Sequence, residues 1–132
     1  MRFMLFVYSG ETGPTLELVK AMNRYNEELS RAGALLAADG LRPPSAATRL
    51  TFSGGARPTV TDGPFTEAKE LVGGYWIIQA RSKEEAVEWA SRAPLGDGTI
   101  EVRQIAEGSD YPPEIEEASR LSQVPPEQTV AE

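Results

Sequence analysis

The sequence has 132 residues, a length that fits one domain with a peripheral tail and leaves little room for a second independent core. Its 13 Lys and Arg residues against 20 Asp and Glu give a formal charge of −7, with no basic cluster that could follow a phosphate backbone, so we expect no direct nucleic-acid binding. The chain has no cysteine and no histidine, which excludes disulfides, thiolate zinc sites, cysteine nucleophiles, imidazole bases and Ser-His-Asp triads.

The N-terminal segment predicts a strand over residues 2–8. Its apolar side chains alternate between two sides, so both faces of this strand are expected to be buried: Phe3, Leu5 and Val7 on one, Met4, Phe6 and Tyr8 on the other. The apolar run is much shorter than a signal-peptide core or the roughly 20 residues of a membrane span. We therefore expect a soluble cytoplasmic protein that makes no membrane contact.

The next segment predicts a helix after Pro14 and then a short strand. Apolar residues recur at steps of four and three and form one helical stripe that Gly33 can end: Leu18, Met22, Tyr25, Leu29 and Ala32. Residues 34–38 form a short apolar run, and the paired prolines Pro43 and Pro44 then disfavour further strand or helix. A strand that ends in a rigid loop is expected here.

The remaining elements follow in a regular order. Residues 48–52 and 57–61 predict a β-hairpin around Gly54 and Gly55, whose glycines can adopt positive φ angles. Residues 71–79 have strand composition, and residues 82–85 form a capping box that begins a helix ended before Pro94. Residues 100–105 supply the last core strand.

This order, β-α-β, hairpin, β-α-β, predicts an α+β fold: a ferredoxin-like split βαβ sandwich with an inserted β-hairpin. The domain is expected to span residues 1–106. Residues 107–132 form an acidic, proline-rich tail that we interpret as an arm or a partly disordered segment, with a short helix near 115–121.

The apolar pattern also predicts a homodimer. Two helices can cover one face of the sheet, yet the strand at 2–8 and the strand around Tyr75–Ile78 are apolar on both faces. A second copy is the simplest cover for the remaining face, which would otherwise exceed the apolar patch usual for monomers. The alternative is that the hairpin and the tail fold back over that face.

The most distinctive segment spans residues 62–70 and reads Asp-Gly-Pro-Phe-Thr-Glu-Ala-Lys-Glu. Asp62 ends a predicted hairpin strand, where a Gly-Pro turn could hold its carboxylate toward a pocket, so Asp62, Lys69 and Glu70 are the candidate catalytic residues. The alternatives stay open: Asp62 can accept a backbone N–H in an Asx-turn, and the other charges can be solvated or paired on the surface.

Five residues are candidates for ligand binding: Tyr25, Arg42, Gly73, Gly74 and Tyr75. The two glycines leave room for a ligand or for the partner's strand. Tyr25 places a phenol at the edge of the sheet cavity or is a core tyrosine with a bonded hydroxyl, and Arg42 could meet an anionic ligand. The carboxylates show no clear metal-ligand spacing, so no metal or other cofactor is expected.

Taken together, these residues resemble the YCII-related, or DGPF-domain, proteins. Residues 62–70 are close to the family's DGPFAETKE, Gly73-Gly74-Tyr75 follows at the expected place, and residues 40–44, Gly-Leu-Arg-Pro-Pro, agree as well. The resemblance covers residues 1–106. It implies a dimeric α+β barrel, in which two ferredoxin-like sheets pack face to face.

The resemblance implies less about function than about fold. One branch of the family is associated with a His-Asp pair whose positions would fall near Met22 and Arg31 here, so a histidine-dependent mechanism does not transfer. DGPF proteins are often associated with sigma factors of the extracytoplasmic-function class, which implies a regulatory or accessory role.

Three functional hypotheses follow. The first is a homodimer that binds a small molecule between helix and sheet, in support of a sigma-factor system. The second is a cofactor-independent lyase or isomerase in which Asp62 or Glu70 removes a proton next to a carbonyl while Lys69 or Arg42 stabilises the oxyanion. The third is a purely structural partner domain.

Overall fold

The computed structural model describes residues 1–9, 14–63 and 71–123. Its elements, in chain order, are β1 (Arg2–Ser9), α1 (Leu16–Arg31), β2 (Leu35–Gly40), the 3-10 turn η1 (Pro44–Ala46), β3 (Thr48–Thr51), β4 (Thr59–Asp62), β5 (Leu71–Gln79), α2 (Lys83–Ser91), β6 (Thr99–Gln104), the 3-10 turn η2 (Gly108–Asp110) and α3 (Pro113–Gln123).

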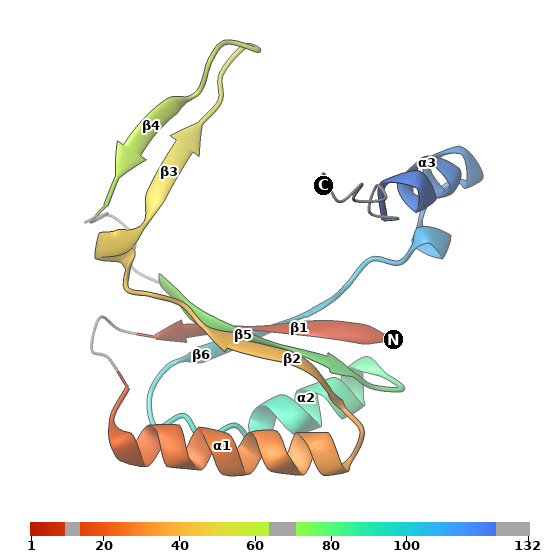
Figure 1. Cartoon of the computed structure of the whole chain (residues 1–132). Helices are drawn as coiled ribbons and strands as arrows, with labels where there is room; N and C mark the ends of the chain where they lie inside the picture. Colours follow the sequence, from red (N-terminus) through yellow and green to blue (C-terminus); the bar gives the residue numbers. More distant parts are fainter. Residues whose placement is uncertain (10–13, 64–70, 124–132) are drawn as a thin grey trace, which may run out of the picture.

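Four of the strands form one antiparallel sheet in the order β2-β5-β1-β6. The helices α1 and α2 cover one face of this sheet, and β3 and β4 pair separately as a hairpin (Figure 1). This is the predicted ferredoxin-like α+β arrangement, in which each β-α-β half places its helix on the same side of the sheet.

Local signals determine where the helices begin and end. The Thr15 side chain accepts a hydrogen bond from the Leu18 backbone N–H at 3.1 Å, which caps α1, and Gly33 follows the helix with a φ of 70°. The Ser82 hydroxyl oxygen accepts from the Glu85 N–H at 3.1 Å and caps α2. Both helices therefore begin at the predicted capping or proline-flanked positions.

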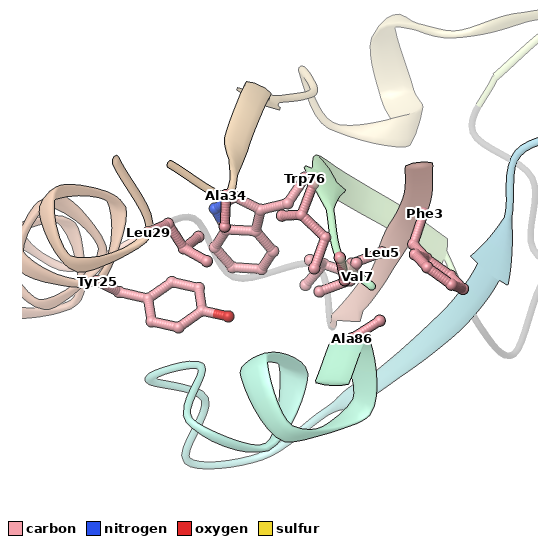
Figure 2. Packing of buried hydrophobic residues seen from close by; sticks show 10 residues of the cluster. Phe3, Leu5, Val7, Tyr25, Leu29, Ala34, Trp76 and Ala86 are labelled. Atoms are coloured by element: carbon pink, nitrogen blue, oxygen red, sulfur yellow. The ribbon is translucent and has the colours of Figure 1, made fainter. Parts of the chain in front are cut away.

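The core lies between the sheet and the two helices. β1 and β5 turn alternate residues toward this layer, so Phe3 and Leu5 pack beside Trp76 and Ile78, and α1 adds Tyr25 and Leu29 (Figure 2). Smaller side chains fill the rest: Val7, Ala34, Ala80 and Ala86. Tyr25 and Leu29 of the expected helical stripe thus meet the core-facing strand residues in one cluster, with Met22 packed against it. Ala32, the last residue of that stripe, follows α1 and is exposed.

No helix of the described part of the chain packs against the opposite side of the sheet, and we call this side the open face (Figure 1). Strand alternation places on it Met4, Phe6 and Tyr8 of β1 and Tyr75 and Ile77 of β5, all partly exposed. The β3–β4 hairpin and α3 both project on this side (Figure 1). None of the described helices is long and apolar enough to cross a membrane.

We call the β3–β4 hairpin the first arm and the segment from Glu107 to the end of α3 the second arm. Among the described residues neither arm makes extensive contact with the four-stranded sheet; β3 packs against β4, and α3 packs against η2. The start of the second arm is tied to β1, because the Arg2 guanidinium pairs with the Glu107 carboxylate at 2.9 Å. This pairing lowers the pKa of Glu107. The helix expected near 115–121 begins earlier and is longer, spanning Pro113–Gln123.

Candidate functional site

A pocket of about 340 Å³ lies between the N-terminal half of α1 and the adjoining ends of β2 and β5, and we call it the α1 pocket. Most of its lining is apolar, with two asparagines on the helix side. The lining residues are Val7, Pro14, Leu18, Val19, Met22, Asn23, Asn26, Ala38, Asp39, Gly40, Leu41, Gly73, Gly74, Tyr75, Trp76 and Leu95. The volume is at the lower end of the range typical of small-molecule sites.

The sheet side of the pocket is shaped by glycine. Gly74 pairs with Gly40 across β5 and β2, and a Cβ built on Gly74 would lie 2.9 Å from the carbonyl oxygen of Asp39. The Leu41 N–H donates to the Gly73 carbonyl oxygen at 2.9 Å and extends this pairing past β2. At Gly74, the missing side chain therefore makes room for the neighbouring strand β2 of the same chain. The roles expected for the two glycines, room for a ligand or for the partner's strand, stay predictions.

Trp76 forms the inner wall of the α1 pocket and is almost completely buried. Its indole Nε1–H donates to the Asn26 side-chain oxygen at 2.7 Å. Its ring meets the Tyr25 ring edge-on, with centroids 5.2 Å apart and an interplanar angle of 80°. Trp76 is thus held from two directions by α1, which fixes the position of the pocket wall.

Tyr25 lies one layer behind that wall and is not among the described lining residues. Its hydroxyl donates to the Trp89 backbone oxygen at 2.5 Å, and Figure 2 shows the hydroxyl pointing from α1 toward the α2 side of the core. Burial is the main cause that raises the pKa of Tyr25 to about 12, so the phenol stays protonated at neutral pH. Tyr25 thus has the burial and the bonded hydroxyl of a core tyrosine, which is one of the two alternatives given for it from the sequence.

Tyr75 and Asp39 are among the lining residues of the pocket, but they are paired across β5 and β2 and alternation directs both side chains to the open face. There the Tyr75 hydroxyl donates to the Asp39 carboxylate at 2.8 Å. This hydrogen bond, together with the carboxylate's charge, raises the pKa of Tyr75. The pair therefore faces the same side as Phe6 and Ile77 rather than the cavity.

The other candidates lie apart from the pocket or outside the described residues. Arg42 is exposed in the proline loop, and Asp62 is exposed at the end of β4; neither lines the α1 pocket. Lys69 and Glu70 lie outside the described residues. The assigned roles of these four residues stay predictions, as do those of Tyr25, Gly73, Gly74 and Tyr75.

Asp62 and Gly63 close the base of the hairpin. The Thr48 hydroxyl donates to Asp62 Oδ1 at 2.8 Å across the β3–β4 pair, and the Gly63 N–H donates to the Ala47 carbonyl oxygen at 2.8 Å. A Cβ on Gly63 would collide with the backbone carbonyl oxygen of Pro44. Asp62 and Gly63, the first two residues of the distinctive 62–70 segment, thus hold the base of the hairpin close to η1.

Sequence reasoning missed the two asparagines of the pocket. Asn26 lies four residues after Met22 and three after Asn23, so all three face the same side of α1. A polar residue at that spacing beside an apolar stripe was the available signal. It is weak, because the edge of any amphipathic helix carries such residues.

Comparison with known proteins agrees with this architecture. The model of the YCII-related domain matches residues 1–109. An uncharacterised protein of Rhizobium meliloti is 34% identical over 92 residues, which cover 67% of this chain and 73% of the relative. The family match spans both β-α-β halves, the hairpin and the whole described α1 pocket, and on this evidence the chain belongs to the YCII-related family.

Proposed function

We propose that this protein binds a small molecule in the α1 pocket and does so as a homodimer. The observation that carries the binding proposal is a pocket of about 340 Å³ with mainly apolar walls, whose inner wall Trp76 is held in place by hydrogen bonding and ring packing. Concave, mostly apolar cavities with a few fixed polar groups are typical of ligand sites.

A matched pair of variants tests the binding proposal. Val19 lines the pocket and is 41% exposed, whereas Val87 on α2 is 43% exposed and does not line it. Acetophenone is the probe, and the indole N–H signal of Trp76 in NMR spectra is the readout, assigned with Trp76→Phe and referenced to Trp89. We expect a saturable shift of the Trp76 signal, which Val19→Phe weakens several-fold because the larger ring narrows the pocket. Val87→Phe should leave the titration unchanged.

A titration in which the Trp76 signal never moves would remove the binding proposal. So would an equal loss in Val19→Phe and Val87→Phe, because the ligand would then bind elsewhere.

The dimer proposal draws its support from the open face. Central strands β1 and β5 carry apolar residues there, and the hairpin and α3 project on the same side without covering the sheet (Figure 1). The arms also carry exposed apolar side chains: Leu50, Phe52 and Val60 on the hairpin and Tyr111 and Ile115 on the second arm. A second copy docked on the open face would cover the sheet and lie between these arms.

Sedimentation equilibrium tests this proposal with Phe6→Glu and, as a control on the helix side, Val87→Glu. We expect the native protein and Val87→Glu to sediment at twice the 14.3 kDa mass of one chain. Phe6→Glu should sediment at one chain mass, because a carboxylate at the centre of the open face would have to be desolvated in the dimer. A native protein that sediments as a single chain at micromolar concentration would overturn the dimer.

The accessory role in a sigma-factor system stays a prediction that rests on the resemblance. The lyase or isomerase alternative gains no supporting observation: Asp62 is exposed on the hairpin with Thr48 as its partner, and the only carboxylate in the described lining, Asp39, is bonded to Tyr75.

A further inference from the structure

The orientation of the Asn26 amide in the α1 pocket is fixed by its neighbour. An indole Nε1–H can only donate, so the Asn26 atom that lies 2.7 Å from it must be the side-chain oxygen. The Nδ2 amino group of Asn26 therefore has its two hydrogens left, and no described residue accepts from them. Asn26 is partly exposed and lines the pocket, so these two hydrogens are free to donate to an acceptor bound there.

This orientation is set in advance by a chain of contacts that begins in α2. The Trp89 backbone oxygen accepts from the Tyr25 hydroxyl, the Tyr25 ring packs edge-on against Trp76, and Trp76 donates to Asn26. Because each side chain is held by the one behind it, little rotational freedom is left for a ligand to remove.

The rest of the lining argues against a charged ligand. The described lining contains no Lys or Arg, and its one carboxylate, Asp39, belongs to a residue whose side chain bonds Tyr75 on the open face. A charged ligand would lose its hydration among these apolar walls without gaining an oppositely charged partner. The desolvation cost of an uncharged ligand is far smaller.

We infer that the α1 pocket selects uncharged ligands carrying a hydrogen-bond acceptor, such as a ketone, ester or amide carbonyl, and that Asn26 Nδ2 recognises this acceptor. The inference rests on the proposed binding function and adds to it the chemical class of the ligand and the residue that determines specificity.

Four probes of nearly the same shape separate the possibilities. Acetophenone is neutral and has an acceptor, α-methylstyrene replaces its carbonyl oxygen with a methylene group, benzoate is an anion and benzamidinium is a cation. With the Trp76 indole signal as readout, we expect acetophenone to bind about 2- to 10-fold more tightly than α-methylstyrene, the worth of one net hydrogen bond. Both ions should bind more weakly than acetophenone.

The variant Asn26→Asp keeps an oxygen to accept from Trp76 Nε1 but removes the amino donors and adds a negative charge. We expect it to lose the preference for acetophenone over α-methylstyrene and to bind benzamidinium more tightly than the native protein does. Asn23→Asp, three residues earlier at the exposed rim of the same pocket, adds the same charge without touching the Trp76 contact, and should keep the preference for acetophenone.

The outcomes distinguish the role of Asn26 from the proposal that the α1 pocket binds a small molecule. If no probe moves the Trp76 signal, the pocket binds nothing of this class and both fall. If acetophenone and α-methylstyrene bind equally well in the native protein, or if benzoate binds most tightly, the pocket stands and the role of Asn26 falls. The native ranking decides this point even if Asn26→Asp does not fold.

Discussion

Trp76→Ala should lower the free energy of unfolding by about 3–5 kcal/mol, the cost of removing a large aromatic side chain from a packed core. Trp76 is 3% exposed and packs among the core residues of β1, β5 and α1 (Figure 2). The variant also removes the edge-on contact with Tyr25 and leaves the Asn26 oxygen without its donor. Urea unfolding followed by circular dichroism measures the change.

Two further variants make this result specific. Trp76→Phe keeps a ring in the same place and should cost less than Trp76→Ala, because the loss is then mainly the hydrogen bond and part of the volume. Leu16→Ala removes a side chain that is 69% exposed in the first turn of α1, and should change stability by less than about 0.5 kcal/mol. Similar losses in Trp76→Ala and Leu16→Ala would contradict the core described here.

The elements were predictable where a local signal decides them. Residues 2–8 alternate apolar side chains on both sides, and they form β1, one of the two central strands, with one face in the core and the other open. Ser82 has the capping chemistry that begins α2, and Gly54 and Gly55 adopt the positive φ angles expected of the hairpin turn. These features depend on a few neighbouring residues, which is why composition and spacing reveal them.

The site was less predictable because it is assembled from distant segments. Asn26 and Trp76 are 50 positions apart, and their contact requires α1 to cross β5 at one register. Tyr25 could be described only as a choice between core and cavity, since its partner is a backbone oxygen of α2. The most distinctive residue, Asp62, draws attention to the hairpin, whereas the described pocket lies between α1 and the sheet.

A pair of glycines that face each other across two strands gives the second large effect. Gly74→Ala should destabilise the protein by about 1–3 kcal/mol, because the new Cβ would lie 2.9 Å from the Asp39 carbonyl oxygen and 3.4 Å from the Gly40 Cα, both of them backbone atoms that cannot simply rotate away. Gly40 is the matched control, since it pairs with Gly74 and a Cβ built on it meets nothing within 4 Å.

Gly40→Ala should therefore be neutral or slightly stabilising, because alanine restricts the unfolded chain without strain in the folded one. Thermal and urea unfolding of the two variants measure the difference, and equal destabilisation would show that the close approach of β2 to β5 is not the cause. The asymmetry matters for the pocket, because Gly40 and Gly74 both line it. If Gly74→Ala pushes β2 outward, acetophenone should bind less tightly to that variant than to Gly40→Ala, which would connect the glycine that permits the strand spacing to the shape of the site.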